Sequence, residues 1–161
     1  MRYASGTSVS EERSRSEIQY WLERFGADQF CYASDKVTSM AQIRFRFKGA
    51  SFAFNLPLAT TQSPCVRRTK AGKLRTDIQA GEAMVIENRR RWRSLALALK
   101  AMLVGVEDGI FNFGEVFLPY MIFGDGRTVG QSMLPQIEKV LAEGRSLPAL
   151  PPLNRQLEAS R

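Results

Sequence analysis

The sequence predicts one α+β domain, in which a short N-terminal helix, a small antiparallel β-sheet and a long basic loop precede a helical C-terminal half. Three observations predict this class. Apolar residues recur at helical spacing near the N-terminus and again after residue 80, whereas they alternate strictly between residues 42 and 56. A stretch rich in Pro, Thr, Ser and Gly separates the two patterns. A chain of 161 residues is most simply one domain, which we place at residues 1–153, with a loose tail at 154–161.

The first helix is predicted at residues 15–25. Ser14 and Glu17 have the spacing of a capping box. The apolar residues that follow recur at i, i+3, i+4 and i+7, and they are Ile18, Trp21, Leu22 and Phe25. Gly26 ends the pattern. Residues 1–13 are polar, and we expect them to be extended or frayed.

Three antiparallel strands are predicted next, at residues 30–33, 42–48 and 51–56, with a turn at residues 49–50. In the second strand apolar and basic residues alternate. One face carries Ile43, Phe45 and Phe47, and the other carries Arg44, Arg46 and Lys48. This alternation predicts a sheet with one face against the core and one face in water.

Residues 57–80 combine Pro, Thr, Ser and Gly with few apolar residues, so the sequence predicts a long loop. The loop contains five cations: Arg67, Arg68, Lys70, Lys73 and Arg75. Because so little apolar surface can be buried here, we expect the loop to be mobile and to be cut first by trypsin.

The longest helix is predicted at about residues 82–107. Its apolar stripe consists of Trp92, Leu95, Leu99, Met102 or Leu103, and Val106. At about 100° per residue, the cations beside this stripe form a basic edge of Arg89, Arg93 and Lys100. Trp92 is therefore expected in the core.

Beyond this helix, the aromatic residues between 111 and 120 predict a second helix or helical turn. A small hairpin is predicted at residues 121–129. Pro135 is expected to start a last helix that ends near Glu143, since proline is favoured in the first helical turn. Residues 147–153 are expected to lie extended along the body.

The cations are concentrated in the middle of the chain. Thirteen of the 23 Lys and Arg residues lie between Met40 and Lys100, together with only three of the 16 acids. Charge gathered in one stretch indicates a surface that binds an anion. The candidate binding residues are Arg44, Arg46, Lys48, Arg67, Arg68, Lys70, Lys73, Arg89, Arg90 and Arg93.

The chain contains no histidine, which removes the commonest general base and most transition-metal sites. We therefore expect no catalytic residue, metal or cofactor, and a carboxylate-based nuclease is disfavoured because paired acids at useful spacing are missing. Glu107, Asp108 and Glu115 do not make a convincing cation site. Cys31 and Cys65 are expected to be free thiols. No apolar run approaches the roughly 18 residues that a membrane span needs, so no membrane partner is expected.

Each basic group also has a plain structural interpretation. The strand cations could form a solvated face or protect an edge strand from pairing. The cluster Arg89-Arg90-Arg91-Trp92-Arg93 could be an exposed helix surface, although four Arg in five residues favour bidentate phosphate contact. The aromatic residues of the strands could stack on bases, but the alternation points them into the core.

Several short motifs resemble a family of small proteins encoded by bacteriophages and prophages. They occur near the start (Arg2-Tyr3-Ala4, Gly26-Ala27-Asp28-Gln29-Phe30), in the middle (Arg91-Trp92-Arg93-Ser94-Leu95) and near the end (Asp125-Gly126-Arg127-Thr128-Val129-Gly130). The resemblance covers most of the chain except residues 57–80. It implies a phage protein in the cytoplasm of a bacterial host, without implying an activity or any site residue.

The function predicted from the sequence is that of a non-catalytic phage accessory protein, which binds nucleic acid through phosphate contacts with little sequence preference. The alternative is a phage interaction protein that inhibits or redirects a host factor, such as a defence complex. The sequence leaves open whether DNA or RNA is bound, whether the strand is single or double, and which oligomer forms.

Overall fold

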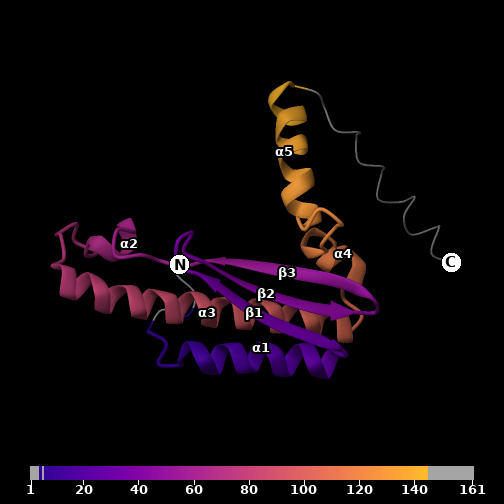
Figure 1. The fold of residues 1–161 in the computed structure, drawn as a ribbon, viewed down its shortest axis with the longest axis horizontal. Coiled ribbons are helices and arrows are strands. Elements are labelled where there is room, and N and C mark those ends of the chain that lie inside the picture. The colour runs from indigo at the N-terminus through magenta and orange to yellow at the C-terminus, as the bar shows by residue number, and fades with distance from the viewer. Residues whose placement is uncertain (1–3, 5, 145–161) are drawn as a thin grey trace.

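The computed structural model describes residue 4 and residues 6–144, and it has the predicted α+β class. The predicted extended segment at 147–153 and the tail at 154–161 lie outside the described residues. Figure 1 shows one antiparallel sheet beside a pair of helices, with a further helix projecting from one end of the molecule.

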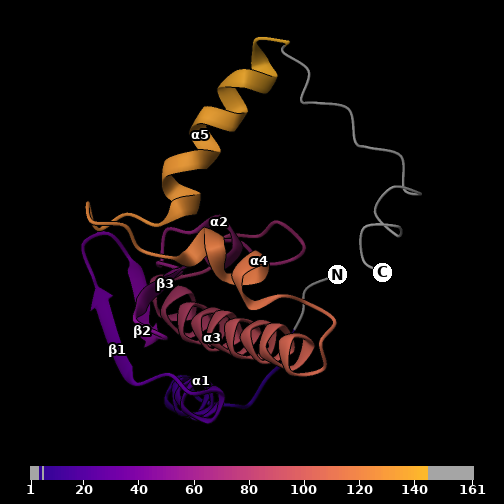
Figure 2. The same ribbon diagram turned by 90° about the vertical axis from the view of Figure 1, so that its right-hand side faces the viewer.

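The sheet has the strand order β1-β2-β3, with β1 at Gln29–Asp35, β2 at Met40–Phe47 and β3 at Ala50–Pro57. Both pairs are antiparallel, as predicted. The two helices α1 (Glu11–Phe25) and α3 (Asp77–Glu107) lie on one side of the sheet, and its other face is open (Figure 2).

A two-residue turn joins β2 to β3 and moves Lys48 out of the strand. Both Lys48 and Gly49 have positive φ, at 48° and 81°, which is the backbone of a type I′ hairpin turn. Glycine adopts this conformation without strain. The expectation that Lys48 shares the strand face with Arg44 and Arg46 is therefore wrong, because it lies in the turn at the end of the sheet.

The main core lies between the sheet and the helices. Its fully buried members include Trp92 and Leu99 of α3, as the helical stripe predicts. The inward side chains of the strands also pack as predicted, and Phe45 and Phe52 are 3% and 2% exposed. These rings are stacked 5.1 Å apart inside the core, so they are not available to stack on bases.

Helix α1 begins four residues earlier than the sequence predicts. Its N-cap is Ser10, whose side chain accepts a hydrogen bond from the backbone N–H of Arg13. Ser14 is not the cap. It is fully buried inside the helix and donates its hydroxyl to the carbonyl of Ser10. The helix starts before Ser14 because the acidic residues Glu11 and Glu12 are also favoured in a first helical turn.

The expectation of one long loop at residues 57–80 is also wrong. The segment contains a short helix, α2 (Pro64–Arg67), and its last residues already belong to α3. A second small core, built from Ala59, Val66 and Ala80, holds it against α3. These side chains are small, so the composition of the segment understated how well it can pack.

Helix α3 begins at Asp77, five residues before its predicted start, because Thr76 and Gln79 form a capping box. After α3 the chain forms α4 (Phe113–Phe117) and the short 3-10 helix η1 (Leu118–Tyr120), in the aromatic segment where a helix is predicted. The predicted hairpin at 121–129 is confirmed by pairing between Ile122 and Thr128.

The last helix, α5, spans Val129–Ala142 and so begins six residues before the predicted start at Pro135. Thr128 is its N-cap and forms a capping box with Gln131. Pro135 lies inside the helix. The stronger capping signal upstream therefore sets the start, and the proline is tolerated further along.

Candidate anion-binding surfaces

The ten predicted cations do not form one surface. Arg44 and Arg46 lie on the open face of the sheet, and Lys48 lies at the end of that face. Four others lie near the opposite end of the sheet, on a segment that we call the basic turn (residues 67–75), and they are Arg67, Arg68, Lys70 and Lys73. The remaining three are on α3, and they are Arg89, Arg90 and Arg93.

The sheet separates the first two groups. The chain leaves β3 toward the basic turn at Pro57, which pairs with Met40. Arg46 is six residues along β2 from Met40, a distance of about 20 Å at roughly 3.3 Å per residue. One phosphate cannot contact both groups, so a ligand that uses both must be an extended polyanion.

On the open face, Arg44 is exposed and has no carboxylate partner among the described residues. Its Nε donates to the side-chain oxygen of Gln42 on the same face. Gln42 in turn donates to Asn55 of β3, at 2.7 Å. These amide contacts orient the guanidinium without neutralising its charge.

Arg46 is neutralised by Asp28. Nε lies 3.0 Å from Oδ1 and Nη2 lies 2.9 Å from Oδ2, so the contact is bidentate. The hydrogen bond from Arg46 lowers the pKa of Asp28, and the Asp28 carboxylate raises the pKa of Arg46. An anion must therefore compete with Asp28 for this side chain.

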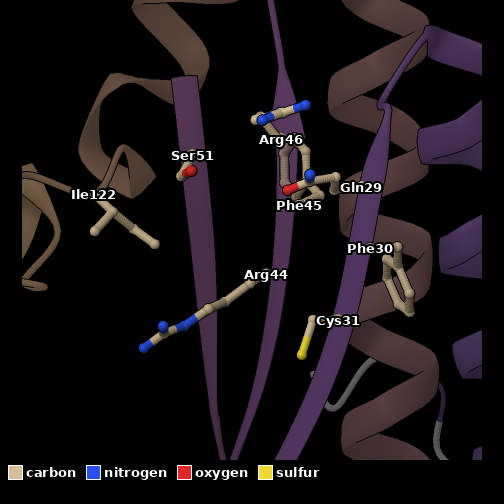
Figure 3. Close-up of a pocket in the computed structure, with 8 residues that line it drawn as sticks. All are labelled: Gln29, Phe30, Cys31, Arg44, Phe45, Arg46, Ser51 and Ile122. Atoms are coloured by element: carbon tan, nitrogen blue, oxygen red, sulfur yellow. The ribbon is translucent and has the colours of Figure 1, made fainter. Parts of the chain in front are cut away.

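A shallow hollow of about 620 Å³ lies on this face and includes Arg44 and Arg46. Figure 3 shows the Arg44 side chain extending across the sheet toward β3, with Cys31 of β1 nearby. Ser51 and Ile122 border the hollow on the β3 side. Its polar groups are donors and neutral acceptors, which suit an anion, and the two aromatic residues that line it, Phe30 and Phe45, pack with the core.

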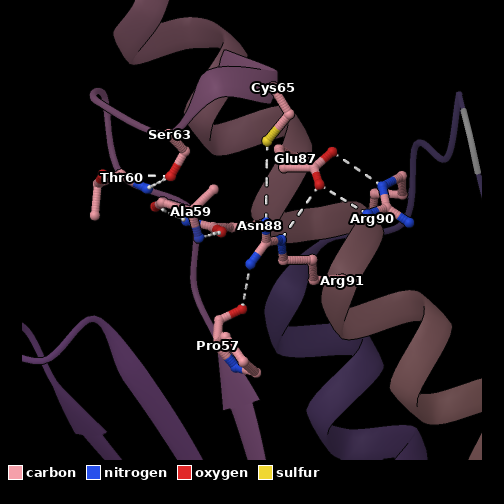
Figure 4. Close-up of polar contacts among 9 residues, drawn as sticks. All are labelled: Pro57, Ala59, Thr60, Ser63, Cys65, Glu87, Asn88, Arg90 and Arg91. Atoms are coloured by element: carbon pink, nitrogen blue, oxygen red, sulfur yellow. Dashed lines mark hydrogen bonds and ion pairs between the residues drawn. The ribbon is translucent and has the colours of Figure 1, made fainter. Parts of the chain in front are cut away.

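The arginines of α3 mostly hold the protein together. Glu87 is 8% exposed and accepts hydrogen bonds from both Arg90 and Arg91 (Figure 4). The hydrogen bond that Arg90 donates to Glu87 raises the pKa of Arg90. Arg91 also donates to the carbonyl of Pro57 at 2.6 Å, which ties the end of β3 to α3. This pair of arginines offsets a buried carboxylate, a role that the cluster's composition does not reveal.

The other two arginines of the cluster face α1. Arg93 forms an ion pair with Glu17. Arg89 is exposed, and its charge acts on two carboxylates at the start of α1, Glu11 and Glu12. Burial raises the pKa of Glu11, which the nearby cations oppose. The α3 arginines are therefore already close to acids of their own chain.

The basic turn is an ordered structure. Arg68 pairs with Leu74 across it, and the backbone N–H of Thr69 donates to the carbonyl of Lys73 at 2.8 Å. Arg75 reaches under the turn and donates to the carbonyls of Val66 and Arg68. These bonds give the turn a fixed shape, which reduces the entropy lost when a ligand binds.

Three cations on this turn are exposed without a carboxylate partner among the described residues: Arg68, Lys70 and Lys73. Arg67 differs, since its Nη1 lies 2.6 Å from Asp77. A second hollow, of about 520 Å³, adjoins the turn and is lined by Lys70, Arg75 and Arg90 together with Cys65 and Thr7. Within residues 6–144, the turn thus brings together three cations that no carboxylate neutralises.

The structure adds residues that the sequence did not single out. Gln42 and Asn55 orient Arg44, Asp28 neutralises Arg46, and Arg75 supports the basic turn. Because alternate residues of a strand lie on the same face, the sequence contained the information needed to put Gln42 and Asn55 on the face of Arg44. The pairing of Asp28 with Arg46 depends on strand register, which the sequence does not give.

Cys31 and Cys65 are both free thiols, as predicted; Cys31 is exposed and Cys65 is half-buried. Within the described residues, no group of three or more His, Cys, Asp or Glu side chains is placed to hold a metal ion. No helix in the same part of the chain has both the length and the apolar character to cross a bilayer.

Comparison with known proteins gave no match to any family model, curated protein or solved structure.

Proposed function

We propose that the protein binds nucleic acid through its phosphates, with the basic turn as the principal contact and Arg44 as a second one. The observation that carries the proposal is the trio Arg68, Lys70 and Lys73, exposed on an ordered turn and without carboxylate partners among the described residues. Cations that a fold needs for its own stability are paired, as Arg90 is with Glu87. Unpaired cations on a fixed backbone are suited to an external anion.

The separation of the two contacts favours a polyanion over a small anion. The sheet keeps Arg44 far from the basic turn, and a nucleic-acid backbone can reach both because its phosphates repeat along the strand. The exposed groups on these surfaces are mainly charged or amide side chains, which contact phosphate and sugar, so little sequence preference is expected. Buried rings such as Phe45 and Phe52 take no part.

The resemblance of several short motifs to phage-encoded proteins suggests a setting for this proposal. We infer a non-catalytic accessory protein of a bacteriophage that acts in the cytoplasm of its host, where phage nucleic acid is accessible. The competing interpretation is a protein that inhibits a host factor. Such a protein does not need to bind free polyanions.

Fluorescence anisotropy with labelled DNA and RNA oligonucleotides, single- and double-stranded, tests the proposal over a range of salt concentrations. The logarithm of the binding constant should fall linearly with the logarithm of salt, by about 0.7 to 0.9 per phosphate contacted. The triple variant Arg68→Gln, Lys70→Gln, Lys73→Gln should lower this slope by about two to three, because each lost phosphate contact removes about one.

A matched control removes the same number of charges elsewhere, through Arg24→Gln, Arg127→Gln and Lys139→Gln. It should leave the slope nearly unchanged. Equal losses in the two triple variants would show that only net charge matters, and the assignment to the basic turn would then be wrong. No binding at low salt to any of the four oligonucleotides would overturn the proposal and favour the interaction protein.

A further inference from the structure

Helix α5 is amphipathic, but none of the other described residues covers its apolar face beyond the first turn. It is described throughout and has no buried residue. Four large apolar side chains along it, 39 to 56% exposed, are Met133, Leu134, Ile137 and Leu141. At about 100° per residue they lie within one stripe, and Pro135 falls on the opposite, polar side. Figures 1 and 2 show the helix projecting away from the sheet and the other helices.

The base of the helix shows which way this stripe faces. Gly130 lies against η1, and a Cβ there would stand 2.9 Å from the carbonyl oxygen of Pro119. Gly130 lies in the middle of the apolar stripe by helical angle. The face that rests on η1 at the first turn therefore continues uncovered along the rest of α5.

The spacing of apolar residues along α5, with a glycine on each side of them, matches its own reverse; the second glycine, Gly144, lies just past the end of α5. Counting outward from Ile137, Leu134 corresponds to Val140, Met133 to Leu141, and Gly130 to Gly144. Two copies that pack antiparallel about a two-fold axis at Ile137 therefore place apolar residues opposite apolar residues at every step. The glycines fall at the ends, where the tip of one helix meets the base of the other. Such self-complementarity is what a two-fold interface requires.

We propose that α5 is a homodimerisation helix, which packs antiparallel against α5 of a second copy of this chain about Ile137. A parallel pair is disfavoured because η1 lies against Gly130 on the apolar side of each base, so the two η1 segments would meet. In an antiparallel pair only Gly144, which is past the end of α5, comes opposite Gly130 and η1. An anionic membrane is a poor occupant, because the polar side of α5 and its C-cap carry one Lys, Lys139, but two acids, Glu138 and Glu143.

The exposed area is sufficient for such a contact. Leu118 of η1 and Phe123 of the hairpin are also about half exposed near the base of α5. Together with the four helix residues they offer on the order of 500 Å² of apolar surface, at the upper end of what a monomer usually exposes. With the polar border included, this approaches the roughly 800 Å² per partner of a standard interface. The proposal does not depend on nucleic-acid binding.

Sedimentation of the full-length protein over a range of concentrations tests the dimer directly. We expect a mass of twice the 18.1 kDa chain at high concentration and dissociation on dilution. Ile137→Glu places two like charges at the axis and should raise the dissociation constant by at least about 100-fold. The matched control Ala142→Glu adds the same charge on the polar side and should change it less than about threefold. Circular dichroism checks that both variants keep their helices.

A two-fold axis perpendicular to the helices also brings a border residue that lies close to the axis next to its own copy. Glu138 borders the stripe one residue from the axis, so Glu138→Gln should strengthen an antiparallel dimer by relieving repulsion. In a parallel dimer Glu138 and its copy would lie on opposite sides of the interface, and the same change would leave the dissociation constant nearly unchanged.

Oxidative cross-linking, with Cys31 and Cys65 replaced by Ser, fixes the register without relying on a destabilising variant. Ile137→Cys should cross-link to itself, and Met133→Cys should cross-link to Leu141→Cys in a mixture of the two variants but not to itself. Self-linking of Met133→Cys would overturn the antiparallel arrangement. A monomer at every concentration, including one that binds some other protein, would overturn the proposal.

Discussion

Asp28 and Arg46 form a bidentate ion pair on the open face of the sheet, with contacts of 2.9 to 3.1 Å between the carboxylate and the guanidinium. Asp28 directly precedes β1, and Arg46 is near the end of β2. The backbone N–H of Asp28 also donates to the carbonyl of Arg46. The pair therefore fixes the side chain of Arg46 and cancels the charge that it would offer to a phosphate.

Replacing Asp28 by Asn should raise the affinity for nucleic acid. The amide has one acceptor oxygen in place of two and carries no charge, so Arg46 is held less strongly and becomes available beside Arg44. The salt dependence should steepen by up to about one unit, as expected for one added phosphate contact. Asp108→Asn is the control, because Asp108 is exposed and has no ion pair among the described residues. Equal affinity of the two variants would show that Arg46 does not contact the ligand.

The same pair gives a pH dependence with a definite sign. Because the hydrogen bond from Arg46 lowers the pKa of Asp28 below its ordinary value of 3.8, its contribution to stability is present above about pH 4. It is lost as the pH falls through the lower pKa of the folded state. The contribution is small, since the pair is exposed. Thermal melting of the wild type should therefore decline more below pH 4 than that of Asp28→Asn, and parallel curves would contradict this.

Local patterns in the sequence predict the class of the fold and most of its elements. Both the alternation along β2 and the apolar stripe through Trp92 depend only on residues that are close together in the sequence. Helix starts were predicted less well. Ser10, Thr76 and Thr128 are the N-caps, whereas the sequence patterns placed the first cap at Ser14 and the other two helix starts at about residue 82 and at Pro135. The candidate site was predicted only in part, because the partners of its cations are distant in sequence.

The arginine cluster shows this limit most clearly. Four Arg in five residues have a composition typical of a phosphate-binding surface, and nothing local reveals that Glu17 lies opposite Arg93. Pro57 likewise comes to Arg91 only through the path of the chain around the sheet. By contrast, Arg68, Lys70 and Lys73 are exposed, and none of the described carboxylates pairs with them.

Two glycines of α3 should respond oppositely to alanine. A Cβ on Gly105 would lie 2.5 Å from the ring of Phe111, whereas a Cβ on Gly81 would meet nothing within 4 Å. Gly81→Ala should stabilise the protein by about 0.5–1 kcal/mol through helix propensity. At Gly105 the ring must be displaced, and overpacking of about 1–3 kcal/mol should cancel or exceed that gain. Denaturant unfolding measures both, and equal stabilisation would show that the Phe111 ring moves away without cost.

Trp92 should tolerate phenylalanine far better than alanine. Its side chain is fully buried, but its Nε1 has no hydrogen-bond partner among the described residues. Trp92→Phe therefore loses volume but no hydrogen bond, and it should cost about 1–2 kcal/mol, compared with about 3–5 kcal/mol for Trp92→Ala. The ring also packs edge-on against Tyr32, at 5.4 Å between centroids, which phenylalanine can preserve. Urea titrations of the three proteins compare the losses, and similar losses in both variants would show that the indole N–H matters.

Asn88 fastens the segment before the basic turn to α3. Its Oδ1 accepts from the backbone N–H of Ala59 at 2.7 Å, and its Nδ2 donates to the carbonyl of the same residue at 3.2 Å (Figure 4). One side chain thus satisfies both backbone groups of a residue that is 3% exposed. Asn88→Ala should cost about 1–3 kcal/mol, because both groups lose their partner in a buried place.

The same substitution should also loosen the basic turn, which limited trypsin digestion can follow. The composition of residues 57–80 predicted that trypsin would cut there first, whereas the contacts of Ala59, Val66 and Asn88 lead us to expect slow cleavage of the wild type at residues 67–75. Asn88→Ala should be cut there several times faster, and Asn55→Ala on the open face of the sheet should not. If the wild type is cut as fast as Asn88→Ala, these contacts do not hold the segment. The turn would then bind phosphates only by paying the entropy of ordering, and its three cations would contribute less affinity than a fixed turn allows.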